Sequence, residues 1–112
     1  LIMTLFPYTT LFRSDIFAKQ PEQLMAKMAK NCKDRRLERG YSRRTLAEKT
    51  GVPAPTIERF EQTGKISLES FCAIVVEFGY FDEMFEILSK AKYSTGAELE
   101  TINKNKNRKK GR

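Results

Sequence analysis

Residues 43–61 constrain the fold of this 112-residue chain more than any other segment. They spell RRTLAEKTGVPAPTIERFE, which is two short helix-forming runs separated by a glycine and a proline. Gly51 suits the left-handed backbone that ends a helix, and Val52 is expected to fill the corner behind it. Ile57 and Phe60, three residues apart, fall on one face of the second helix. The segment therefore predicts two short helices that cross closely at a tight turn.

Such a pair has the form of a helix-turn-helix, a motif whose second helix enters a groove of DNA. Leu46 and Ala47 lie on the inner face of the first helix, and a small residue at position 47 permits the close crossing. A plain helical hairpin with no role in DNA binding is the alternative. The residues expected to face outward from the second helix are Ala54, Pro55, Glu58, Arg59 and Gln62.

The spacing of apolar residues along the chain predicts an all-α fold with no strand. The five helices are expected at residues 22–39, 43–50, 54–62, 68–78 and 82–89. The side chains expected to face inward are Leu24, Met28, Cys32 and Leu37 in the first helix, and Phe71, Cys72, Val75 and Phe78 in the fourth.

Three consecutive patterns carry a resemblance to a known family. They are R-x-x-R-G-Y-S at residues 36–42, then LAEKTGV, then TIERFEQTG in the second helix of the motif. In that order they are similar to the XRE (lambda/434 repressor-like) family of helix-turn-helix transcriptional regulators, over about residues 22–90. The resemblance implies a five-helix lambda-repressor-like domain at residues 15–92. It also implies a sequence-specific repressor that binds double-stranded DNA as a homodimer.

A narrower resemblance leaves a second function open. The continuation RFE-x-TG-x-ISLESF, then FGYFDEMFEIL, is similar to small HipB-type regulators with a basic tail. Several of those are encoded beside HipA-type kinase toxins and act as their antitoxins. The chain would then bind and neutralise a toxin protein and repress its own operon. A third reading is non-specific nucleic-acid binding through the basic tail.

The family resemblance implies roles for individual residues. Arg59 takes a position that often reaches a base edge, and arginine suits the two major-groove acceptors of guanine. Arg43 takes the place usually held by a glutamine that binds the DNA backbone. Arg36 and Glu61 match a partly buried ion pair between the first helix and the recognition helix, which we interpret as structural. The residues implied to bind DNA are Arg43, Arg44, Ala54, Pro55, Thr56, Glu58, Arg59, Gln62 and Lys65.

Two prolines depart from the usual start of a recognition helix. Pro53 stands where a serine or threonine cap is expected, so one helix-start amide lacks a side-chain acceptor. Pro55 is tolerated because the first-turn amides have no helical partners. Ala54 and Pro55 offer no side-chain hydrogen bonds, only apolar contact with a thymine methyl. Shape readout and phosphate contacts are therefore expected to carry more of the specificity.

Charge is distributed unevenly along the chain, whose net charge is +7 and whose pI is about 9.6. Residues 64–90 carry two basic and five acidic side chains, whereas residues from 91 onward carry seven basic and two acidic. This asymmetry favours a polyanion on one part of the protein and a different contact elsewhere. We expect residues 93–112 to be a flexible basic tail, with one turn of helix at residues 94–100 capped by Ser94 or Thr95. Residues 101–112 are expected to be either a soluble disordered end or a flexible arm that binds phosphates. Its expected phosphate contacts are Lys104, Lys106, Arg108, Lys109, Lys110 and Arg112.

Large apolar side chains are dense between residues 78 and 88. They are Phe78, Tyr80, Phe81, Met84, Phe85, Ile87 and Leu88. Core packing is one interpretation. A domain this small can scarcely bury them all, so the other is that some form a dimer face or a toxin-binding surface. A dimer would place two recognition helices about 34 Å apart, on successive turns of one DNA groove.

The first residues require a separate interpretation. Residues 4–14, TLFPYTTLFRS, resemble the translation of a common short-read sequencing adapter, residue for residue. We therefore expect residues 1–14 to be a disordered assembly artefact, so that Asp15 marks where real sequence begins and not the protein's true N-terminus. The segment is apolar enough for a signal peptide, but no basic residue precedes it and no cleavage site follows.

Composition disfavours several classes of function. Cys32 and Cys72 are the two cysteines and histidine is absent, so we expect buried free thiols rather than a disulfide, and no zinc site. No Gly-rich phosphate loop, nucleophile elbow or close carboxylate pair is present, so we expect neither catalysis nor a cofactor. Beyond residue 14 no apolar run approaches the roughly 20 residues that cross a membrane. The expected location is the cytoplasm of a prokaryote, in association with the nucleoid.

Overall fold

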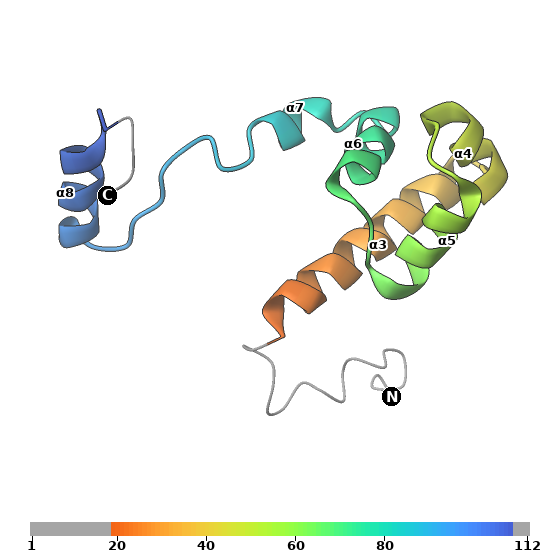
Figure 1. The fold of residues 1–112 in the computed structure, drawn as a ribbon, viewed down its shortest axis with the longest axis horizontal. Helices are drawn as coiled ribbons and strands as arrows, with labels where there is room; N and C mark the ends of the chain where they lie inside the picture. The colour runs from red at the N-terminus through yellow and green to blue at the C-terminus, as the bar shows by residue number, and fades with distance from the viewer. Residues whose placement is uncertain (1–18, 109–112) are drawn as a thin grey trace. The chain divides into compact units, whose positions relative to one another are not determined.

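The computed structural model describes residues 19–108, all of whose regular structure is helical (Figure 1). The predicted all-α class is confirmed for this part of the chain. The segment assigned to a sequencing adapter, residues 1–14, lies outside it. Contacts divide the chain after Tyr80 into two units. The first contains α3 (Gln20–Glu38), α4 (Arg43–Thr50), α5 (Ala54–Thr63) and α6 (Leu68–Glu77), and the second contains α7 (Phe81–Phe85) and α8 (Gly96–Asn105).

The predicted turn between the two helices of the motif is present between α4 and α5. Ser42 begins α4, because its side chain accepts a hydrogen bond from the Thr45 amide at 3.0 Å. Gly51 ends α4 with φ of 82°, in the left-handed region that favours glycine. The hydroxyl of Thr50 donates to the Leu46 carbonyl at 2.8 Å and accepts from the Val52 amide at 3.1 Å. Threonine and glycine together therefore fix the exit of the chain from α4.

The same arrangement ends α5. The Thr63 hydroxyl donates to the Arg59 carbonyl at 2.7 Å and accepts from the Lys65 amide at 3.1 Å. Gly64 follows with φ of 80°. A Cβ at Gly64 would lie only 3.2 Å from the Met25 carbonyl carbon of α3, so both backbone angle and space require glycine here. The end of α5 is thereby held directly against α3.

The core of the first unit lies where α5 packs on α3 and α4, and where α6 packs on α4 (Figure 1). Phe60 and Phe71 meet edge to face at the centre, with ring centroids 5.8 Å apart. Of the predicted inward positions of the helix-turn-helix, Leu46, Val52, Ile57 and Phe60 are buried, whereas Ala47 is half-buried. The side chains buried in α6 and at its end are Phe71, Ile74, Val75 and Phe78.

The prediction for the inner face of α3 is wrong in part. Leu24 and Leu37 were expected inside, but they are 61% and 55% exposed. Ala29 and Arg36 are the buried residues of this helix, while Cys32 between them is half-buried. The small Ala29 permits close packing, and Arg36 turns the helix so that its guanidinium reaches Glu61 of α5. The rotation of α3 therefore follows this ion pair rather than the leucines.

The C-terminal ends of α3 and α6 are joined by one arginine. Arg39 Nη1 donates to the Glu77 carbonyl and Nη2 to the Phe78 carbonyl, both at 3.2 Å. The same guanidinium lies over the Phe78 ring, 5.3 Å from its centroid. Carbonyls at the end of a helix have no helical donors, so Arg39 satisfies two of them. Sequence reasoning did not anticipate this contact.

In α6 the prediction is wrong at one inward position. Cys72 was expected to be buried, but it is exposed, and Ile74 is buried in its place. The expectation of two buried thiols is therefore wrong for Cys72. The outer side of α6 instead carries Leu68, Cys72 and Val76, which lie four residues apart and are all exposed.

The second unit differs from the prediction in two places. The helix expected at residues 82–89 ends at Phe85, and Leu88 has φ of 64° and is 95% exposed. Without burial of Ile87 and Leu88, no packing energy favours continuing the helix. The single turn of helix expected at residues 94–100 is part of a longer helix, α8, which ends at Asn105. Thr95 caps α8 by accepting from the Glu98 amide at 3.1 Å, and this cap explains where the helix begins.

A pair of substitutions in α6 tests the observed burial. We expect Ile74→Ala to lower the free energy of unfolding by about 2–5 kcal/mol, because it leaves a cavity in the core. Val76→Ala, on the exposed side of the same helix, should change it by no more than about 0.5 kcal/mol. Urea denaturation followed by circular dichroism measures both. Equal losses for the two variants would contradict this packing.

Candidate nucleic-acid interface

The outer face of α5 is open to solvent. Pro55, Glu58, Arg59 and Gln62 are exposed, whereas Ala54 and Thr56 are half-buried. The opposite face carries the buried Ile57 and Phe60, so α5 is fixed on one side and free on the other. The structure thus separates the residues that hold this helix from those expected to contact DNA.

The start of α5 offers few hydrogen-bond donors. Pro53 occupies the cap position and makes no side-chain cap, as its sequence implied. Its carbonyl accepts from the Thr56 amide at 2.9 Å and from the Ile57 amide at 3.1 Å. Pro55 has no amide hydrogen. Only the Ala54 amide in this first turn is left for an outside acceptor.

Arg59 is the one basic side chain of α5. Within residues 19–108 its guanidinium has no hydrogen-bond or ion-pair partner. Glu58 and Gln62 lie one turn apart on the same helix and share a weak hydrogen bond of 3.4 Å from Gln62 Nε2 to Glu58 Oε2. The planar fork of Arg59 is therefore the strongest free donor on this face.

A buried carboxylate links three helices behind that face. Arg36 of α3 donates to Glu61 twice, from Nε at 2.7 Å and from Nη2 at 3.0 Å. Arg43 at the start of α4 donates to the same carboxylate from Nε at 2.9 Å. The Glu61 side chain is only 2% exposed. The expected Arg36–Glu61 pair is present, and Arg43 was not anticipated as a third member.

The positive charge around α5 comes from its neighbours. Because α5 carries Glu58 and Glu61 against Arg59 alone, it contributes no net positive charge of its own. Arg44 extends from α4, 4.0 Å from Glu48 at its nearest and mostly exposed, and Lys65 follows α5 at the surface. Attraction toward a polyanion therefore depends on α4 and on the turn after α5.

The outer face of α3 is largely self-compensated. Lys30 Nζ pairs with Asp34 at 2.9 Å, and Arg35 donates to Glu38 through Nε at 2.8 Å and Nη2 at 2.6 Å. The hydrogen bond from Lys30 lowers the pKa of the Asp34 carboxyl below its ordinary value. These pairs within one helix favour a solvated face for this side of α3.

The expected tail contacts are only partly described. Lys104, Lys106 and Arg108 are exposed, and Arg108 Nη1 donates to the Asn105 side-chain oxygen at 3.0 Å. Lys109, Lys110 and Arg112 lie outside the described residues. The three described cations sit at the end of α8 or just after it, in the second unit.

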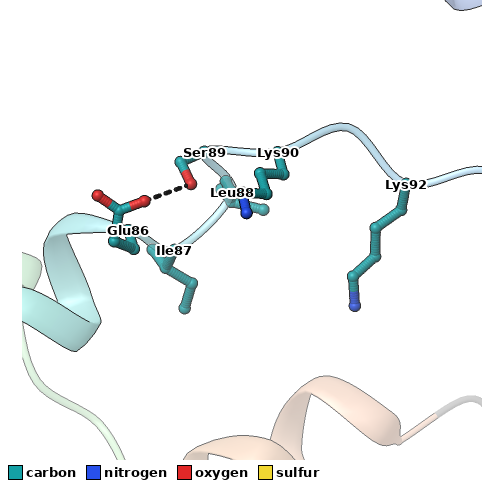
Figure 2. Close-up of a pocket in the computed structure, with 6 residues that line it drawn as sticks. All are labelled: Glu86, Ile87, Leu88, Ser89, Lys90 and Lys92. Atoms are coloured by element: carbon teal, nitrogen blue, oxygen red, sulfur yellow. Dashed lines mark hydrogen bonds between the residues drawn. The ribbon is translucent and has the colours of Figure 1, made fainter.

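Other features of the described part of the chain are its potential metal ligands, a pocket and the hydropathy of its helices. Its acidic and cysteine side chains form no cluster of three that would hold a metal ion. An open pocket occurs in the second unit at the bend 86–92 (Figure 2). The Ser89 hydroxyl donates to Glu86 there at 2.8 Å, as the dashed line in Figure 2 shows. Among residues 19–108 no helix is long and apolar enough to cross a membrane.

Comparison of this chain with protein-family models, with curated proteins and with solved structures finds no match.

The two thiols should differ sharply in reactivity. Burial, and after it the negative charge of Glu61, raise the pKa of Cys32 from 9.0 to about 11. Thiolate is the reactive form, so Cys32 should be almost inert at pH 8, whereas the exposed Cys72 reacts. A short iodoacetamide pulse followed by peptide mass spectrometry should find the label on Cys72, and on both residues in urea. Equal labelling in the native protein would contradict the packing around Glu61.

Proposed function

We propose that the chain is a sequence-specific, double-stranded DNA-binding regulator of the XRE helix-turn-helix class, with α5 as its recognition helix. One observation carries the proposal. The outer face of α5 is free, with an unpaired arginine at its middle, while its inner face is locked by Ile57, Phe60 and Glu61. A recognition helix needs this combination, because base contacts demand a rigid helix whose readout side is unoccupied.

Sequence readout in this proposal depends mainly on Arg59. A bidentate arginine matches O6 and N7 of guanine in the major groove. Glu58 and Gln62 add an acceptor and an amide that suit cytosine and adenine edges. Ala54, Pro55 and Thr56 lie at the start of the helix and offer only apolar contact or a single hydroxyl. Arginine readout combined with DNA shape is thus favoured over a dense network of base contacts.

Phosphate contacts in the proposal come from the flanks of α5. Arg43, Arg44 and Lys65 provide three cations on α4 and after α5. Phosphate contacts set the register of a protein on the duplex, and they contribute to sequence selection only indirectly, through the shape of the DNA backbone. The cations of the tail would add affinity that weakens steeply with salt.

The proposed regulator acts as a homodimer. Exposed Leu68, Cys72 and Val76 on one side of α6, and the stacked Phe81 and Phe85 rings of α7, favour a protein contact. A toxin protein that uses these apolar residues is the second candidate partner, and an antitoxin role is compatible with DNA binding. Sedimentation equilibrium separates a self-associating chain from a monomer that awaits another partner.

Selection of bound sequences from random duplex DNA tests the proposal. The full chain, at near-physiological salt, should enrich a two-fold-related site with half-sites about one helical turn apart. Enrichment of a single unpaired half-site would argue against the dimer but retain sequence-specific binding. Binding without enrichment, lost as salt rises, would instead support non-specific contacts through the basic tail.

A substitution of the reading arginine gives the sharpest prediction. Arg59→Ala should weaken binding to the selected site by about 1–3 kcal/mol and hardly change binding to random duplex, because it removes a base contact. Arg44→Ala is the matched control and should weaken both to a similar degree, as a phosphate contact would. Fluorescence anisotropy titrations measure the four affinities. If Arg59→Ala lowered the affinity for both duplexes equally, Arg59 would not read bases.

A further inference from the structure

The positive charge next to the Glu61 carboxylate exceeds the charge required to neutralise it. Arg36 already satisfies it with two hydrogen bonds, and Arg36 Nη1 donates its own further bond to the Tyr41 carbonyl at 2.9 Å. Arg43 adds a third hydrogen bond to the same carboxylate. Two guanidinium groups against one carboxylate leave one unit of positive charge uncompensated. Neutralising Glu61 therefore does not explain why Arg43 lies there.

The surplus charge resides at the surface on Arg43. The Arg36 side chain is buried, whereas that of Arg43 is 36% exposed. Only Nε of Arg43 is engaged by Glu61, and among residues 19–108 nothing accepts a hydrogen bond from its two terminal nitrogens. An arginine held through Nε keeps its other donors in a fixed plane.

We propose that Glu61 is a positioning residue that fixes Arg43 so that its terminal nitrogens bind one phosphate of the DNA backbone. The inference rests on the proposed DNA-binding function and assigns a second role to the recognition helix. The outer face of α5 reads bases, and on its inner face Glu61 orients Arg43 of α4 toward a phosphate. One carboxylate thus sets the register between the base-reading Arg59 and the backbone contact.

The geometry distinguishes arginine from lysine at position 43. Arginine donates to Glu61 and to a phosphate at once, because its donors lie on three separate nitrogens. A lysine has one nitrogen at the end of its stem, and the buried carboxylate would hold it. Charge would be retained at this position while the phosphate contact is lost.

Lysine substitution in the full chain tests the proposal. Arg43→Lys and Arg43→Ala should both weaken binding to the selected duplex about tenfold, as expected for losing a charge-assisted hydrogen bond. Each should also reduce the slope of log K against log salt by about 0.9, the value for one phosphate. Arg35→Lys is the matched control, because Arg35 is also 36% exposed and also donates from Nε to a carboxylate. It should bind as the unchanged protein does, and thermal melting should find all three variants folded.

The outcomes separate this inference from the proposed function. If Arg43→Lys binds with unchanged affinity and salt slope, the positioning role is overturned while DNA binding stands. If the unchanged chain binds no duplex, both proposals fail.

A second measurement, on the free protein, is independent of DNA. The Arg43 Nε–H signal in NMR spectra should exchange slowly with solvent, and rapid exchange would overturn the fixed geometry.

Discussion

The buried pair between Arg36 and Glu61 is the interaction on which the rest of this structure depends. Taking both charges out of water is costly, and it is tolerated because each group is surrounded by partners at 2.7 to 3.0 Å. The pair sets the rotation of α3, and through the Tyr41 carbonyl it also holds the segment that leads into α4. Apolar residues packed in the same space could give similar stability, so the main contribution of the pair is to fix the orientation of the helices.

The sequence predicted those elements whose ends are marked by local chemistry. Serine caps and left-handed glycines act within a few residues, so α4 and α5 were placed within one residue of their observed bounds. Burial was harder to predict, because it depends on which other helices pack against each face. Leu24 remains exposed on α3, and Ile74 is buried where Cys72 is exposed. A cap at Thr95 was among those predicted from the sequence, but α8 extends to Asn105, beyond the single turn predicted at residues 94–100.

The candidate interface was predictable as a set of positions but not as a network. Exposure of Arg59 and burial of Glu61 both follow from helical periodicity around Ile57 and Phe60. The contact from Arg43 to Glu61 spans 18 residues and crosses a turn, so no spacing rule reveals it. Its one sequence signal is an unusual count, two arginines at 36 and 43 for a single inward carboxylate. Once the helical register shows which charged side chains face inward, their numbers of positive and negative charges can be compared, and an excess of arginines indicates such a shared contact.

The paired threonine–glycine ends of α4 and α5 bear on how such a protein diversifies. Thr50 and Gly51 end α4, whereas Thr63 and Gly64 end α5, where Gly64 lies against Met25. None of these residues is among the outward-facing Ala54, Pro55, Glu58, Arg59 and Gln62. Length and placement of this helix are therefore independent of the side chains it presents. In the function proposed above, those side chains could therefore be exchanged, and the preferred target changed, at little cost in folding stability. The exposed side chains of α5 can thus vary while the ends and the buried face of the helix stay the same.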